Sequence, residues 1–276
     1  RRNKGLSALA DVAGMDEAPS TYHLGFLMGP RVNAGGRVGQ ANLGAKLLST
    51  ENSQEALDIA QKLDAYNAER QEIEATVLEE ALVLAEIKAK EKTSQSLVFI
   101  VGKNWHPGVI GIVASRLKER YGLPACVLTV NNDVATGSGR SITGVDLGAC
   151  VISARQAGVL TNGGGHAMAA GFSLNADKLE VFETFLSERI GKQIVEGGIL
   201  PTLNVDGLIT IEGASMDLVE ILNRMAPFGT GNAEPRLVFS GVRITKVDIV
   251  GVDHIRCFMT GIDSKKQLSA IAFRCA

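Results

Sequence analysis

The feature that most constrains this chain is a long window without helix-breaking residues. Glycine is absent from Ala45 to Val101, and proline is absent from Arg31 to His106. Within the window, apolar residues recur at helical spacing from Glu55 to Lys92, after a cap at Asn52 or Ser53. We therefore predict one long helix, or two abutting ones, spanning about 57 Å. Regular heptads are lacking, which disfavours a coiled coil and favours a connector between two lobes.

Strand and helix patterns alternate after this window. Helices are expected over residues 108–121, 146–156 and 176–192. Short apolar strands are expected over residues 97–101, 125–130, 137–142 and 169–174. This alternation predicts a mixed sheet flanked by helices.

The chain becomes β-rich beyond Leu200. Strands are expected over residues 203–211, 237–242, 247–252, 255–259 and 268–273, with one helix near residues 215–225. We predict a small barrel or sandwich here, and short helical or irregular pieces over residues 1–45. The predicted fold class is α/β: a mixed sheet flanked by helices, preceded by a long connecting helix and followed by a small β-barrel domain.

The charge distribution limits the kind of polyanion site that the chain can hold. The formal net charge is −2, and residues 41–92 carry six basic against eleven acidic side chains. A protein that coats nucleic acid non-specifically has a basic excess, which is missing here. Any phosphate site must therefore be local, made from a few arginines, backbone N–H groups and helix ends.

Composition also bears on the compartment. The four cysteines, Cys126, Cys150, Cys257 and Cys275, form no Cys-x-x-Cys pair, which predicts a reduced cytoplasmic protein. No apolar run approaches the roughly 20 residues of a membrane span. The first five residues contain neither an initiator Met nor an apolar signal region, so we expect a piece of a longer chain.

The segment Gly163-Gly164-Gly165-His166 is the first candidate for chemistry, and we expect it to be a loop. Three successive glycines remove every Cβ, so backbone N–H groups can approach an anion closely. His166 adds a donor that can be neutral or cationic near neutral pH. A plain glycine turn with a structural histidine explains the residues equally well.

The segment Gly137-Ser138-Gly139-Arg140-Ser141 is a second candidate. A guanidinium and two hydroxyls suit a phosphate group. In a strand, Ser138 and Arg140 would point to the same face. An exposed strand with an ordinary surface arginine is the alternative.

Two further segments carry polar or aromatic side chains at positions where ligands often bind. Trp105 and His106 lie between a strand and a helix N-terminus, although a lone tryptophan is more often part of the core. The stretch from Gly29 to Arg37 contains two arginines and Asn33 among glycines, and a turn with surface arginines is the alternative there.

Several common catalytic patterns are absent from the sequence. It has no P-loop, no Gly-x-Ser-x-Gly nucleophile elbow and no cluster of aspartates and histidines that would hold two metals. We therefore expect any metal centre that serves this protein to lie outside the chain.

Taken in order, these segments resemble the RecJ family, single-strand-specific 5′-to-3′ exonucleases of the DHH phosphoesterase superfamily. The resemblance covers nearly the whole chain and ends with a motif at residues 226–235. The Gly-Gly-Gly-His segment is shared with other DHH phosphoesterases, whereas the full series is specific to RecJ-like proteins. The matching segments are residues 29–37, Asn67-Ala68-Glu69-Arg70, 105–117, 137–141, 163–172 and 226–235.

The resemblance implies a division into domains. Residues 1–40 would be the tail of the DHH catalytic domain, and residues 41–92 the connecting helix. Residues 93–192 would be the DHH-associated substrate-binding domain. Residues 193–276 would be an OB-fold-like domain for single-stranded DNA.

The resemblance also implies cofactors and residue roles. The intact enzyme would bind Mn²⁺ or Mg²⁺ through its Asp-His-His motif, which this chain lacks, so no metal site is expected here and the chain alone is expected to be inactive. His166 would be catalytic, in a loop that closes over the scissile bond. Nucleic-acid or phosphate contacts are implied for Arg31, Asn33, Arg37, Trp105, His106, Ser138, Arg140, Ser141, Gly163, Gly164 and Gly165.

The implied function is substrate binding in a metal-dependent exonuclease of DNA recombination and repair. Single-stranded DNA is the implied partner, together with a helicase or a single-strand-binding protein in the cell. Two alternatives stay open: a DHH-type phosphodiesterase of short oligonucleotides or cyclic dinucleotides, and a non-catalytic nucleic-acid-binding module.

Overall fold

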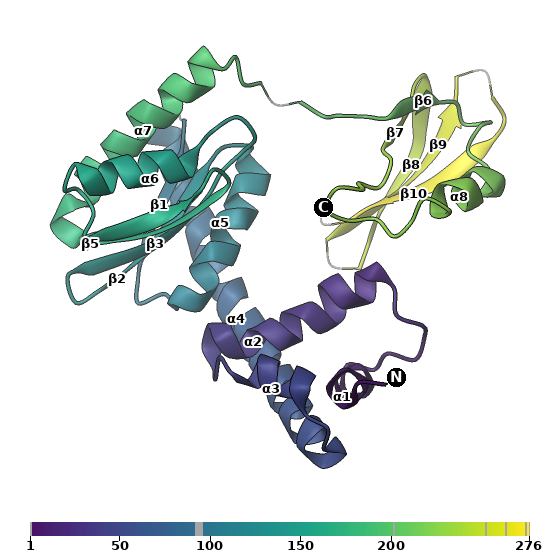
Figure 1. Cartoon of the computed structure of the whole chain (residues 1–276). Helices are drawn as coiled ribbons and strands as arrows, with labels where there is room; N and C mark the ends of the chain where they lie inside the picture. Colours follow the sequence, from purple (N-terminus) through teal and green to yellow (C-terminus); the bar gives the residue numbers. More distant parts are fainter. Residues whose placement is uncertain are drawn as a thin grey trace. The chain divides into compact units, whose positions relative to one another are not determined.

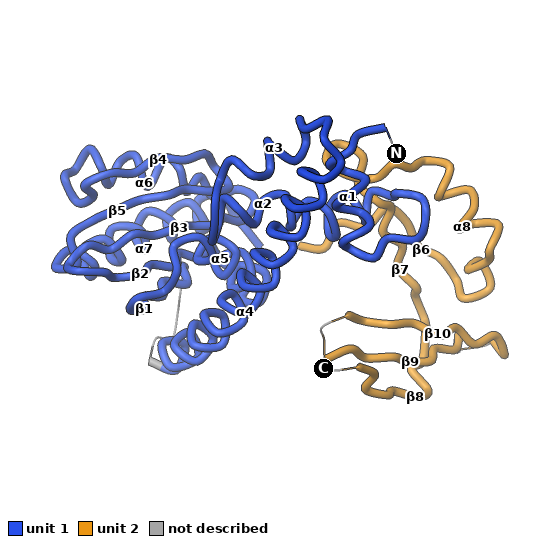
Figure 2. The backbone as a smooth tube through the Cα atoms, turned by 90° about the horizontal axis from the view of Figure 1, so that it is seen from below, with its two compact units in different colours: residues 1–201 blue, residues 202–276 orange. Residues whose placement is uncertain are grey.

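The computed structural model describes residues 2–91, 96–200, 202–251, 253–262, 264–273 and 275. The chain forms two compact units, residues 1–201 and residues 202–276 (Figure 2). Each unit has its own secondary structure and is described by itself.

The long helix is confirmed as a single element, α4 (Ser53–Glu91), of 39 residues. The Asn52 side chain caps it by accepting hydrogen bonds from the backbone N–H groups of Gln54 (2.9 Å) and Glu55 (3.2 Å). Glu91 is the last described residue of the helix, and the predicted end at Lys92 lies outside the described residues.

Four short helices pack around the first half of α4. Together with α4 they bury a small apolar core that includes Leu9, Leu47 and Leu63. These helices are α1 (Lys4–Val12), the π-helix η1 (His23–Met28), α2 (Gly29–Val38) and α3 (Leu43–Ser49).

Residues 29–37 lie within a continuous helix, so their glycines do not form the turn that was one interpretation of this stretch. Pro30 lies in the first turn of α2, directly after the π-helix η1. A Cβ on Gly35 would lie 2.4 Å from the Gln40 carbonyl oxygen and 3.3 Å from Leu63. This glycine therefore lets the backbone after α2 approach the helix closely, and it also leaves room for Leu63 of α4.

A five-stranded mixed sheet forms the centre of residues 98–175, with strand order β1-β2-β3-β5-β4. Only β1 and β2 pair in parallel. The strands are β1 (Val98–Lys103), β2 (Ala125–Asn131), β3 (Val134–Arg140), β4 (Asn162–His166) and β5 (Ala169–Asn175).

Helices cover both faces of this sheet (Figure 1). One face packs against α4 and α5 (Pro107–Tyr121) through Val98, Ile100 and Val127. The other face packs against α6 (Leu147–Gln156) and α7 (Leu179–Glu196) through Phe99 and Phe172. The short 3-10 turn η2 (Ala176–Lys178) precedes α7. The predicted mixed sheet flanked by helices is confirmed.

Local capping residues set one end of each of two of these helices. Asp146 caps α6 by accepting a hydrogen bond from the Ala149 N–H at 2.9 Å. Gly122 ends α5 with φ at +64°, a left-handed conformation that glycine adopts without strain.

The loop predicted at Gly163–His166 is wrong, because these residues form the edge strand β4, antiparallel to β5. Because three of these residues are glycines, the strand shows no alternation of apolar and polar side chains in the sequence. A glycine strand is stable here because α6 packs tightly against it: a Cβ on Gly148 would lie 2.8 Å from the backbone of His166.

The second unit is β-rich, as predicted, but its first strand is shorter than expected. The predicted strand over residues 203–211 reduces to β6 (Gly207–Ile209), which pairs in parallel with β7 (Leu237–Phe239). The helix α8 (Met216–Asn223) intervenes. A second sheet has the order β10-β9-β8.

The strands of that second sheet differ from the predictions mainly at their ends. The strand predicted over residues 247–252 begins earlier, at Val242, and its predicted last residue, Val252, lies outside the described residues. The three strands are β8 (Val242–Val250), β9 (His254–Gly261) and β10 (Gln267–Ala272).

Candidate nucleic-acid interface

Small and polar residues occupy one face of β4 and β5. Residues directly opposite in antiparallel strands point to the same face, and the register aligns Gly164 with Gly171 and Ser138, and His166 with Ala169 and Arg140. The α6 helix packs on the other face, against Gly163 and Gly165. We call this surface the open platform; it consists of Asn162, Gly164, His166, Ala169, Gly171 and Ser173.

The glycines of β4 serve two different purposes. A Cβ on Gly163 would lie 3.0 Å from Leu160 and Val151, and one on Gly165 would lie 2.4 Å from the Ala169 carbonyl oxygen. Both therefore face packed protein. A Cβ on Gly164 would meet nothing within 4 Å, and one on Gly171 would meet only a backbone oxygen at 4.0 Å. Internal packing does not require glycine at Gly164 or Gly171.

A shallow cavity overlies part of the open platform. Its volume is about 250 Å³, and its lining includes Asn162, Gly164, Gly171 and Ser173. Because two of these residues have no Cβ, a ligand in the cavity could approach the strand backbone closely.

Ser138 and Arg140 lie beside the open platform on the same face of β3, as predicted from strand alternation. Arg140 Nη1 donates to Ser138 Oγ at 3.0 Å and to the Gly139 carbonyl oxygen at 2.8 Å. On α5, a Cβ at Gly111 would lie 3.0 Å from both Arg140 Nη2 and Ser138 Oγ. Glycine at this position therefore makes room for the pair.

Arg37 reaches the same region from the last turn of α2. Its Nη1 donates to the Gly108 carbonyl oxygen at 3.2 Å, in the first turn of α5. Burial, and secondarily the positive charge of Arg37, lower the pKa of Arg140 below that of a free arginine. No ion pair recorded for the described residues involves either guanidinium.

We call Arg37, Ser138 and Arg140 the arginine site. Two like charges lie near each other and near the N-terminus of α5, whose backbone dipole is also positive. Within the described part of the chain no carboxylate pairs with them, so an anion is the group that this arrangement would stabilise. The arginine site and the open platform share one face of the sheet.

The remaining predicted site residues in this region differ in their surroundings. Asn33 is exposed on α2, one helical turn before Arg37. The His106 Nδ1 accepts a hydrogen bond from the Gly108 N–H at 3.0 Å, so this ring caps α5. His166 is exposed at the end of β4.

Three predicted site residues have structural partners instead. Trp105 is 5% exposed, and its Nε1–H donates to Glu80 Oε2 at 2.7 Å, which favours the core interpretation. The Ser141 hydroxyl is buried and donates to the Val145 carbonyl oxygen at 2.8 Å. Arg31 forms an ion pair with Asp64 on α4 at 2.7 Å. None of these groups is aimed at the open platform.

Gly111 and Gly171 also belong to this region, although neither was predicted from the sequence as a site residue. A glycine inside a helix costs about 1 kcal/mol relative to alanine, so Gly111 within α5 was a usable signal of close approach. Gly171 could be recognised only through its cross-strand partner Gly164, which requires the strand register.

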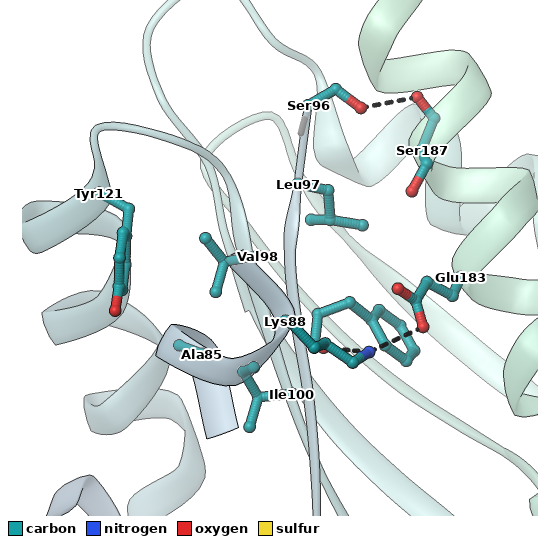
Figure 3. Close-up of a pocket in the computed structure, with 10 residues that line it drawn as sticks. Ala85, Lys88, Ser96, Leu97, Val98, Ile100, Tyr121, Glu183 and Ser187 are labelled. Atoms are coloured by element: carbon teal, nitrogen blue, oxygen red, sulfur yellow. Dashed lines mark hydrogen bonds and ion pairs between the residues drawn. The ribbon is translucent and has the colours of Figure 1, made fainter. Parts of the chain in front are cut away.

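A separate cavity of about 100 Å³ lies at the opposite edge of the sheet, between α4, β1 and α7 (Figure 3). Lys88 Nζ points to Glu183 at 3.0 Å and donates to the Phe99 carbonyl oxygen at 2.9 Å. The polar groups that line this cavity join α4 to β1 and α7. We therefore interpret the cavity as a gap in the packing of these elements and not as a ligand site.

Two properties of the described residues bear on metals and membranes. They contain no group of three or more His, Cys, Asp or Glu side chains placed to hold a metal ion. None of their helices has both the length and the apolar character that crossing a bilayer requires.

Comparison with known proteins adds independent findings. Residues 93–192 match the DHHA1 domain, and residues 205–276 match the RecJ OB domain. The chain is 31% identical to the single-stranded-DNA-specific exonuclease RecJ of Bacillus subtilis, over 98% of this chain and 34% of that protein. It is 33% identical to the RecJ of Escherichia coli, over 98% of this chain and 47% of that protein.

A solved structure agrees with these matches. The structure of RecJ from Thermus thermophilus in complex with Mg²⁺ aligns with a TM-score of 0.74 and 25% identity, over 93% of this chain and 39% of that chain. A structure of the same protein in complex with Mn²⁺ aligns with a TM-score of 0.76 and 24% identity, over 98% of this chain and 38% of that chain.

The fold and the domain matches together define the class: a DHHA1 domain followed by an OB domain. The chain is RecJ-like over nearly its whole length. It spans about a third to a half of the length of the relatives that it matches, 34% for one and 47% for another.

Proposed function

We propose that this chain is the substrate-binding portion of a metal-dependent 5′-to-3′ exonuclease that hydrolyses single-stranded DNA in recombination and repair. The main support is the arginine site: two guanidiniums without carboxylate partners beside a strand face with two open glycines. The relatives are exonucleases specific for single-stranded DNA by name.

Each part of the chain has a place in this proposal. Residues 1–40 would be the tail of a DHH catalytic domain, residues 41–92 a connecting helix, residues 93–192 the substrate-binding domain, and residues 193–276 the OB-fold-like domain. Arg37 and Arg140 would hold one phosphate, with Ser138 as a further donor. Asn33 would line the path of the strand.

The open platform would hold the neighbouring part of the strand. Without Cβ atoms at Gly164 and Gly171, a sugar or phosphate can pack directly on the backbone. His166, exposed at the end of β4, would then lie at the reacting end and donate to a phosphate oxygen. Contacts of this kind depend on salt and only weakly on base sequence.

The proposal places the metal ion in a domain other than those of this chain. The RecJ structures from Thermus thermophilus contain Mg²⁺ or Mn²⁺, but the described residues do not fit such an ion, because they supply no cluster of ligands. We propose that a DHH catalytic domain holds it.

A cellular setting follows from this proposal. We place the protein in the cytoplasm, because its four free cysteines fit a reducing compartment. A helicase would supply the single strand, or a single-strand-binding protein would hold it.

Binding of a fluorescent 5′-phosphorylated 20-mer, measured by anisotropy over a salt series, tests the proposal. We expect Arg140→Ala to weaken binding by about 1–3 kcal/mol, the range for charge-assisted hydrogen bonds. Loss of one phosphate contact should also reduce the slope of log K against log salt by about 0.7. Unchanged affinity at low salt would refute this role for Arg140.

The same assay separates the alternative functions. Tight binding of a cyclic dinucleotide without binding of the 20-mer would indicate a small-substrate phosphodiesterase. Preference for structured RNA would indicate a non-catalytic RNA-binding module. Cleavage of the 20-mer by the pure chain with Mn²⁺ would contradict the assignment of the metal centre to another domain.

A further inference from the structure

A buried polar cluster interrupts the apolar surface of α4. Residues before it, such as Leu63, pack in the core with α1, α2 and α3, and residues after it, such as Val77, pack in the core with β1 and α5. Between them, Asn67 is 4% exposed and Arg70 is 9% exposed. Charged residues are rarely buried to this extent unless they are paired.

The cluster joins α4 to α5. Arg70 forms an ion pair with Glu74 one turn further along α4, and Arg70 Nη2 donates to Asn67 Oδ1 at 3.0 Å. The second carboxylate oxygen of Glu74 faces Arg116 Nε on α5 at 3.8 Å. Glu74 therefore lies between two guanidiniums that come from different helices.

Stability alone is a poor explanation for this cluster. Arg70 Nε is buried without a hydrogen-bond partner, so its desolvation is not fully compensated. Buried ion pairs of this kind contribute little net stability compared with apolar residues, and their best-attested use is to fix register between packed elements.

The helices joined by this cluster contact the elements that bear the arginine site, α2 and β3. The α5 helix bears Gly108, which accepts the hydrogen bond from Arg37, and Gly111, which faces Arg140. The α2 helix, which bears Arg37, is fixed to α4 by the ion pair between Arg31 and Asp64. Asp64 and Glu74 are about 15 Å apart along α4, from 1.5 Å per residue.

We infer that Glu74, with Arg70 and Arg116, is a positioning group: it sets the register of α5 on α4 and thereby the spacing between Arg37 and Arg140. This inference rests on the proposed function, because the spacing matters only if both arginines hold the same anion. Glu74 acts through α5 and does not contact the ligand.

The test is a double-mutant cycle on the whole chain, with the 5′-phosphorylated 20-mer as the probe. Glu74→Gln keeps the shape of the side chain but removes its charge, so Arg70 and Arg116 repel each other. We expect it to weaken binding roughly two- to thirtyfold, the range for residues that couple through packed elements. In the Arg37→Ala background the same change should have a much smaller effect, because only one arginine is left to position.

Two further variants control the experiment. Glu72→Gln removes a carboxylate from the exposed side of α4, and we expect unchanged binding. If Glu74→Gln does not fold, Arg116→Gln, whose side chain is 40% exposed, cuts the same link and should show the same dependence on Arg37.

The outcomes distinguish the inference from the proposed function. Equal losses from Glu74→Gln with and without Arg37, or a lower melting temperature with unchanged affinity, would show that the cluster is only structural. Absence of salt-dependent binding by the unmodified chain would instead overturn the proposed function itself.

Discussion

At the residue scale, neighbouring glycines of one strand have opposite explanations. Gly163 and Gly165 face the packed side of β4, where a Cβ would collide with protein. Gly164 faces open space between them. A glycine that packing does not need loses backbone entropy on folding without any internal gain. Gly164 is therefore better explained by something that approaches from outside.

This contrast gives a matched pair of substitutions. Gly164→Ala should leave the free energy of unfolding unchanged or raise it slightly, and should weaken binding of the 20-mer by about tenfold because the new methyl group occupies ligand space. Gly163→Ala should destabilise the protein by about 1–3 kcal/mol through overpacking. Urea denaturation and anisotropy check the two effects.

One result of these two substitutions would contradict a role of the open platform in binding. If Gly164→Ala binds the 20-mer as tightly as the unmodified chain, the open platform does not contact the strand. The arginine site would then stand alone as the candidate interface.

At the element scale, the sequence predicts those elements whose side chains carry a pattern. The α4 helix was predictable because apolar residues recur through a window without glycine or proline. Asp146 and Gly122 were predictable terminators because their roles depend on local chemistry. The β4 strand was not predictable, because three of its five residues are glycine and its stability comes from β5 and α6.

The candidate site likewise contains residues that could be predicted from the sequence and residues whose role could not. Ser138 and Arg140 were predictable because alternation in a strand places both on one face. The core position of Trp105 was anticipated from its residue type, but its partner Glu80 was not. The structural roles of Ser141 and Arg31 were not predictable, because their partners Val145 and Asp64 depend on tertiary packing. Residue type indicated phosphate chemistry, but only the fold shows which polar groups already have partners.

The contact between α6 and β4 supports a prediction at this scale. Gly148 lets α6 approach β4, since a Cβ would lie 2.8 Å from the backbone of His166. Gly148→Ala should push the helix away, destabilise the protein by about 1–3 kcal/mol, and weaken 20-mer binding by displacing β4. Thermal unfolding and anisotropy measure both effects.

Ile152→Ala is the control for this substitution. Ile152 lies on the same helix but is 36% exposed, so its truncation should cost less than about 1 kcal/mol. Stability equal to the unmodified chain in Gly148→Ala would mean that α6 does not pack on β4 in solution.

At the scale of the whole molecule, the two units differ in how much apolar surface they bury. The first unit has three clusters of buried apolar side chains. Among the described residues of the second unit, only Ile211 is a buried apolar side chain. On β8, Ile244, Val247 and Ile249 are more than half exposed. Burial supplies most of the stability of a domain.

Unequal burial predicts unequal protection of backbone amides from hydrogen exchange. We expect amides of β8, β9 and β10 to exchange on the order of 100-fold faster than those of β1, β2 and β3, because local opening of the second unit exposes little additional apolar surface. Hydrogen–deuterium exchange with mass spectrometry measures this directly, peptide by peptide.

Two truncations show whether burial is the cause of that difference. Leu128→Ala removes a fully buried side chain of β2 and should cost about 2–5 kcal/mol of stability in the first unit. Ile249→Ala removes an exposed side chain of β8 and should cost less than about 0.5 kcal/mol. Equal protection of the two units, with a large loss from Ile249→Ala, would mean instead that the apolar face of β8 is covered in solution.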